Sequence, residues 1–170
     1  MKTTNVKPIL LAPNQGIPNN AGLPLLLYQQ VLQQQEDLVS AFKKAFAQNH
    51  WVGTWVNGVF DYHHYHSVAH EVLGVAAGTA TLIFGGPGGE EIEVKAGDMV
   101  VLPAGTGHCR KHASADFKVV GAYPPGQQDY DICTATDNMA EKQKNIANVK
   151  LPSTDPVSGK EGPLCQHWLQ

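Results

Sequence analysis

The stretch GVFDYHHYHSVAHEVLGVAAG, residues 58–78, decides how the rest of this chain is interpreted. It holds four histidines and a glutamate within nine positions, and no other part of the sequence concentrates potential metal ligands in this way. His64 and His66 are two residues apart, and residues i and i+2 of a strand point to the same side. Both imidazoles can therefore reach one point in space. Glu71 follows after a short turn, where a second strand is expected to begin.

The sequence around this stretch predicts a β protein. From Trp51 to about Tyr123 the apolar residues recur with period two, and glycine, proline and asparagine separate the short runs at regular intervals. Many short, evenly separated strands are typical of a sandwich or a barrel. The expected strands cover residues 51–56, 59–66, 71–77, 79–84, 91–95, 99–102, 107–112 and 117–122.

The flanks of this β region predict helices and irregular chain. Residues 1–22 are expected to run over the surface as an arm, with a short strand at 25–28. Leu38, Phe42, Ala45 and Phe46 form one apolar stripe, which predicts a helix over 35–48. We therefore expect residues 1–50 to be an arm and a helix packed on a barrel core of residues 51–123.

Residues 124–170 are expected to form a C-terminal extension that docks on the same domain. Asn138, with Glu141 three positions on, is a typical helix cap and predicts a helix over 138–147. The last twenty residues are rich in proline and are predicted to be irregular, returning to the core through Leu164, Trp168 and Leu169.

Size, charge and cysteine usage narrow the possible functions. A chain of 170 residues fits one domain, and a net charge of -3 argues against a nucleic-acid or membrane-surface partner. Cys109, Cys133 and Cys165 form an odd, scattered set, which is typical of a reducing compartment. With neither a signal peptide nor a membrane span in the sequence, we expect a cytoplasmic location.

The second informative stretch is GDMVVLPAGTGHCRKH, residues 97–112. Together the two stretches resemble the motifs of the cupin superfamily. Its first motif, G-x5-H-x-H-x3–4-E-x6-G, is matched at every position, and its second, G-x5-P-x-G-x2-H-x3-N, is matched except at the last. The matching residues are Gly58, His64, His66, Glu71 and Gly78, then Gly97, Pro103, Gly105 and His108. His112 stands where the motif has asparagine.

The resemblance implies an all-β jelly-roll, the double-stranded β-helix barrel of cupins, with a flanking helix, a C-terminal tail and one divalent metal ion in its mouth. The residues implied as ligands are His64, His66, Glu71 and His108. The flanks are similar to a family of small uncharacterised bacterial cupins of the YjlB type. Because cupin barrels often pair through outer strands, the resemblance also implies a homodimer.

Three neutral imidazoles and one carboxylate offset one of the ion's two charges, so the site is expected to attract an anionic ligand. Mixed imidazole and carboxylate donors suit Mn, Fe(II), Ni, Co or Zn, and of these we prefer Mn or Fe(II). Cysteine is absent from the implied ligand positions, which argues against a closed structural zinc site.

If the strands are regular, three further polar side chains point into the barrel. Tyr62 shares a face with His64 and His66, and Arg110 and His112 share one with His108. These three are the candidate catalytic residues, with His112 or Tyr62 moving a proton. A β-bulge at Cys109 would invert Arg110 and His112.

Other histidines and aromatic residues are expected to have structural roles. His63 and Tyr65 alternate away from the predicted ligands, and His70 points away from Glu71, which favours a supporting or surface position. His50 and His167 are expected to be incidental. Trp51, Trp55 and Phe60 are expected to make core or dimer contacts.

Two functions remain open at this point. The first is a metal-dependent enzyme, a dioxygenase or an isomerase/epimerase, acting on a small anionic or polyhydroxylated molecule. The alternative is a non-catalytic, metal-dependent cupin that binds a small ligand. A storage role is disfavoured because it requires no metal ligands, and the fold by itself does not decide between the first two.

Overall fold

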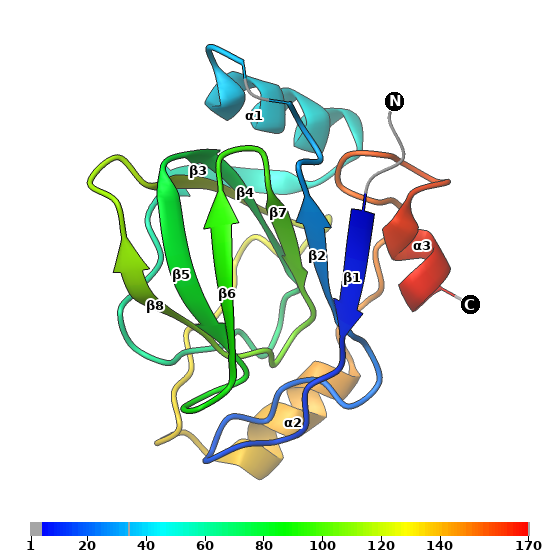
Figure 1. Ribbon diagram of the computed structural model, residues 1–170. Helices are drawn as coiled ribbons and strands as arrows, with labels where there is room; N and C mark the ends of the chain where they lie inside the picture. Colours follow the sequence, from blue (N-terminus) through cyan, green and yellow to red (C-terminus); the bar gives the residue numbers. More distant parts are fainter. Residues whose placement is uncertain (1–4, 34, 170) are drawn as a thin grey trace.

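The computed structural model describes residues 5–33 and 35–169, and it consists mainly of two antiparallel sheets that face each other (Figure 1). The larger sheet has the strand order β1-β2-β7-β4-β9-β3, and the smaller has the order β6-β5-β8. The strands are β1 (Asn5–Ile9), β2 (Leu25–Gln29), β3 (Val52–Asn57), β4 (Glu71–Ala77), β5 (Thr79–Phe84), β6 (Glu90–Lys95), β7 (Met99–Leu102), β8 (His108–Ala113) and β9 (Lys118–Tyr123). The all-β jelly-roll prediction is confirmed.

The core between the two sheets follows from the alternation of side chains along β4. Leu73 and Val75 point toward the small sheet and pack with Leu82 and Phe84 of β5. Glu71 has the same parity as these two residues, so it lies on the inner face. The first residue of β4 is therefore a carboxylate that the strand carries into the barrel interior.

The other face of the large sheet is covered by the helix α1 (Leu38–Gln48), which Figure 1 shows at one end of the sheets. Asp37 caps this helix, accepting a hydrogen bond from the Ser40 backbone amide at 3.0 Å. Phe42 lies against Gly74 of β4 so closely that a Cβ there would be 2.5 Å from the Phe42 ring. The helix can approach the sheet because this strand position carries no side chain.

Two further helices lie in the C-terminal segment. The helix α2 (Met139–Ala147) has Asn138 as its cap, and the side chain accepts from the Glu141 amide at 3.1 Å. The helix α3 (Pro163–Trp168) occupies a stretch that the sequence had suggested was irregular. It buries Leu164 and Trp168 in the cluster beneath α1, whereas Leu169 is 40% exposed.

Two further segments differ from the sequence prediction. Asn5–Ile9 is a strand, β1, paired with β2, where the sequence had suggested a surface arm. Residues 59–66 do not form a continuous strand: only His64 and Tyr65 make isolated bridges, to His108 and Cys133. This segment runs as a loop that is fastened to its neighbours at a few points, and it carries two of the predicted metal ligands.

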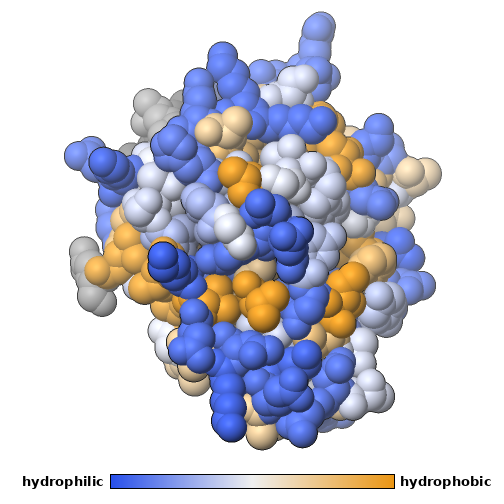
Figure 2. All heavy atoms as spheres, turned by 180° about the vertical axis from the view of Figure 1, so that it is seen from behind, coloured by the Kyte–Doolittle hydropathy of each residue, from blue (hydrophilic) through white to orange (hydrophobic). Residues whose placement is uncertain are grey.

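On the face opposite that of Figure 1, apolar side chains gather in a band across the middle of the surface (Figure 2). None of the helices described for residues 5–33 and 35–169 is long and apolar enough to cross a membrane.

Candidate metal centre

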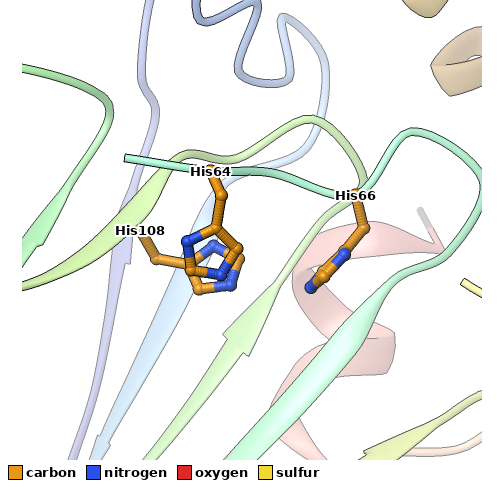
Figure 3. A group of neighbouring side chains, drawn as sticks. All are labelled: His64, His66 and His108. Carbon is orange, nitrogen blue, oxygen red and sulfur yellow. The ribbon is translucent and has the colours of Figure 1, made fainter. Parts of the chain in front are cut away.

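Three histidines from two separate segments meet at one end of the barrel interior. His64 and His66 come from the loop before β4, and His108 is the first residue of β8 (Figure 3). One ring nitrogen from each lies within 4.8 Å of the others, and all three side chains are buried. The rings of His64 and His108 are closest, with centroids 4.0 Å apart. The structure thus brings together the three histidines that the sequence had singled out as ligands.

Backbone carbonyls set the orientation and the protonation of all three rings. A carbonyl oxygen can only accept a hydrogen bond, so the nitrogen facing it carries the proton and the other nitrogen keeps its lone pair. In each ring Nδ1 faces such an oxygen, which leaves Nε2 free as a ligand. The acceptors are the carbonyls of Tyr62 for His64 (2.9 Å), Asp131 for His66 (2.5 Å) and Thr106 for His108 (3.0 Å).

Glu71 adds a carboxylate to this cluster. Its Oε1 lies 3.4 Å from Nε2 of both His66 and His108 and, although it is buried, has no hydrogen-bond donor among residues 5–33 and 35–169. Its Oε2 accepts a hydrogen bond from the Tyr123 hydroxyl at 2.7 Å. A buried carboxylate oxygen without a donor is costly, so Oε1 is suited to a cation.

The Tyr123 hydroxyl is itself held in place by a third side chain. Trp55 Nε1 donates a hydrogen bond to it at 2.7 Å, so the Tyr123 proton is directed to Glu71. The Trp55 ring lies over Gly121, where a Cβ would come within 2.2 Å of the indole. Trp55, Gly121, Tyr123 and Glu71 therefore form one connected support for the carboxylate.

The electrostatics of the cluster favour an anion surrounded by neutral or cationic rings. Burial opposes ionisation of Glu71, but the positive charge that His66 and His108 can carry beside it outweighs burial and lowers the pKa of the carboxyl. Burial lowers the pKa of His64 to about 3, and the neighbouring His108 adds to this effect. For His66 burial acts in the same direction, but Glu71 outweighs it and raises the pKa. The cluster offers an ionised carboxylate and at least one neutral imidazole to a cation.

A cavity of about 450 Å³ opens above these four side chains. Its wall contains the aromatic residues Trp55, Phe60 and Tyr130 and the cationic Arg110. This volume lies within the range of small-molecule sites, roughly 300–1,000 Å³. The arrangement can hold a divalent ion at the floor and a small ligand above it.

The three predicted catalytic residues lie in different places relative to the cavity. Arg110 lines the cavity, with Nη2 3.8 Å from Asp61 Oδ2 at the rim. Tyr62 is 43% exposed and stacks on Phe60, outside the cavity lining. The expectation that His112 faces the cavity is wrong: it is exposed and borders a different hollow.

The position of His112 follows from an irregularity in β8. Leu82 of β5 pairs with Arg110, whereas Thr81, the residue just before Leu82, pairs with His112. Two neighbouring residues of β5 are therefore matched by positions two apart in β8, so β8 has one extra residue at this point. Such a bulge shifts the alternation of side chains by one. Arg110 therefore shares the inner face with Leu82, while His112 shares the outer face with Thr81.

The other residues of the first stretch are structural. Tyr65, expected to face outward, is completely buried and packs with Ile17 and Cys133. His70 is also buried, so its expected surface alternative is wrong; its Nδ1 accepts from the Ala104 amide at 2.8 Å, and its ring lies 5.0 Å from Trp168. Burial lowers the pKa of His70 to about 4. His63 is half-buried.

Sequence reasoning missed two tyrosines of the site. Tyr123 has the same parity as Val119 and Gly121, so the period-two pattern would have found it had the last strand been extended by one residue. Tyr130 lies in a loop without a periodic pattern, and its ring packs against Tyr123 and His66. Only the fold brings it to the cavity.

Comparison with known proteins agrees with this architecture. The sequence profile of a family described as "Cupin domain" matches residues 52–120. The uncharacterized protein YjlB of Bacillus subtilis strain 168 is 41% identical over 160 residues, which are 93% of this chain and 94% of that protein.

Two solved structures are similar to this chain at low identity and low TM-score. An acireductone dioxygenase from Bacillus anthracis with a cadmium ion in its active centre is 18% identical over 51% of this chain and 57% of its own, with a TM-score of 0.36. This chain thus spans little more than half of that one. An uncharacterized protein with a double-stranded β-helix domain from Klebsiella pneumoniae is 13% identical over 77% of this chain and 84% of its own, with a TM-score of 0.37.

Proposed function

This chain belongs to the cupin family, and from that premise we propose that it is a metal-dependent enzyme acting on a small oxygen-bearing molecule. The observation that carries the proposal is the convergence of three imidazoles, each with Nδ1 against a backbone carbonyl, on a buried carboxylate oxygen without a donor. A purely structural polar cluster would pair that oxygen within the protein.

The proposed ligands are Nε2 of His64, His66 and His108 together with Oε1 of Glu71. This donor set suits Mn or Fe(II), and Ni, Co or Zn would also be accepted. A divalent ion bound there would act as a Lewis acid toward an oxygen donor of the substrate. The four side chains supply one negative charge, so the loaded site would still attract an anion.

The remaining residues of the cavity bind, orient and shield the substrate. Leu73 and Val59 are buried apolar residues of the cavity lining and keep water from that part of the wall. Arg110 Nη2 lies 3.8 Å from the exposed carboxylate of Asp61 and can exchange that partner for an anionic group of the substrate. Apart from the proposed ligands, Asp61 Oδ2 and Tyr130 Oη are the lining groups able to exchange a proton.

Two reaction classes suit such a site, oxygen insertion by a dioxygenase and proton transfer by an isomerase or epimerase. Incubating metal-loaded protein with a panel of keto-acids, diols and sugars, with and without oxygen, distinguishes them. Oxygen uptake with a gain in product mass supports the dioxygenase, and an isomeric product without oxygen supports the isomerase. If ligands bind but return unchanged with every metal, the non-catalytic binding function replaces the enzyme.

A further inference from the structure

The wall above the candidate metal centre exposes more apolar surface than polar surface. Val56 is 38% exposed, Phe60 47% and Tyr130 36%, and all three line the cavity. Large apolar side chains exposed together in a hollow with polar groups at its rim are typical of a ligand site. The cavity therefore offers apolar contact directly above a set of charged and polar groups.

Two aromatic pairs border the imidazoles. Phe60 stacks on Tyr62 with ring centroids 5.1 Å apart, and its edge-on contact with His64 has a centroid distance of 5.0 Å. Tyr130 stacks on Tyr123 at 4.7 Å and contacts His66 edge-on at 4.9 Å. Rings that pack against one another at a cavity wall are preorganised to receive a further ring, by offset stacking or an edge-to-face contact.

Polar groups for a sugar-like ligand are few. Outside the four proposed ligands, the polar side chains of the lining are Asn57, Asp61, Arg110 and the hydroxyl of Tyr130, and Trp55 Nε1 is already engaged by Tyr123. Each hydroxyl of a polyhydroxylated ligand needs a hydrogen-bond partner once it leaves water. A cavity of about 450 Å³ with this lining suits a molecule of one or two rings better than a sugar.

We propose that the natural ligand is a small aryl compound with two neighbouring oxygen donors, which faces the metal with its oxygens and the Phe60 and Tyr130 side of the cavity with its ring. This inference rests on the proposed metal-dependent function. It narrows the ligand from any anionic or polyhydroxylated molecule to one with a flat apolar body. An anionic substituent on the ring would find Arg110 at the rim.

Two probes with the same chelating head test the ring contact alone. Acetohydroxamate and benzohydroxamate both present two oxygens to a metal, but only the second has an aryl body. Calorimetry with Co²⁺-loaded protein should show benzohydroxamate binding about ten-fold more tightly, after correction for any preference measured with free Co²⁺. Phe60→Ala and Tyr130→Ala should each remove much of this preference, which is expressed as the ratio of the two hydroxamate affinities so that a general change in chelate binding cancels.

Val68→Ala is the matched control, because Val68 is 40% exposed and lies outside the cavity lining. It should retain the full preference. Protein that binds Co²⁺ but binds both hydroxamates equally would overturn the aryl ligand and leave the metal function standing. Protein that binds no divalent ion would overturn both. A preference that persists in Phe60→Ala and Tyr130→Ala would overturn the assigned ring contacts.

Discussion

At the scale of single residues, the site depends on how Glu71 is held. Its two oxygens have different surroundings: Oε2 is hydrogen-bonded to Tyr123, and Oε1 faces two imidazoles without a donor. This division directs one oxygen to the protein and the other to the proposed ion. Outer hydrogen bonds of this kind orient metal ligands and typically change metal affinity by about 10–100-fold when removed.

Replacing Tyr123 with phenylalanine should therefore weaken Co²⁺ binding by about ten-fold or more, because Oε2 of Glu71 loses its donor and the carboxylate can rotate. A chelator competition gives the affinity, and the Co²⁺ absorption spectrum reports the changed ligand geometry. Tyr130→Phe is the control, since Tyr130 has no hydrogen bond to Glu71 in the described structure. Unchanged affinity and an unchanged spectrum in Tyr123→Phe would rule out the positioning role.

The sequence allowed the positions of the ligand histidines to be predicted, but not the side of the sheet on which His112 lies. Spacing i, i+2 places His64 and His66 on one side whether the chain is a strand or an extended loop. His112 lies beyond the extra residue in β8, and a single inserted residue reverses the side on which every later residue falls. Residue types alone do not reveal where such a bulge occurs.

At the scale of elements, the period-two pattern located the strands that pair continuously, and it failed for residues 59–66. The side chains of His64 and Tyr65 do alternate in direction there. However, the neighbouring segments of the chain pair with this stretch only at isolated bridges. The strand β1 was missed because Asn5–Ile9 has little burial and gains its regularity from pairing with β2. In both cases the outcome depends on which segment pairs with the stretch, and a single sequence does not show strand pairing.

The contact between α1 and β4 gives a prediction at this scale. Gly74→Ala should destabilise the protein by about 1–3 kcal/mol, because a Cβ at this position overlaps the buried Phe42 ring. Urea unfolding measures the loss. In a Phe42→Leu background the same substitution should cost less, since the smaller side chain leaves space. An equal cost in both backgrounds would show that the ring is not the obstacle.

At the scale of the whole molecule, the homodimer implied by the resemblance stays a prediction. β3 is one of the two terminal strands of the larger sheet, the other being β1. A terminal strand has one side free for pairing with another chain. Light scattering coupled to size exclusion should give twice the chain mass of 18.3 kDa if the dimer forms. A mass of one chain at micromolar concentration would contradict it.

The central claim is that three histidines and Glu71 hold one divalent ion, and metal content tests it most directly. Protein prepared with Mn²⁺ or Fe(II), desalted and measured by inductively coupled plasma mass spectrometry, should carry about one ion per chain. The variant His64→Ala/His66→Ala should carry none, and the control His112→Ala/His167→Ala, two exposed histidines away from the cluster, should match the parent protein. Stoichiometric metal in the first variant, or its absence from the parent protein with every divalent ion tried, would contradict the account.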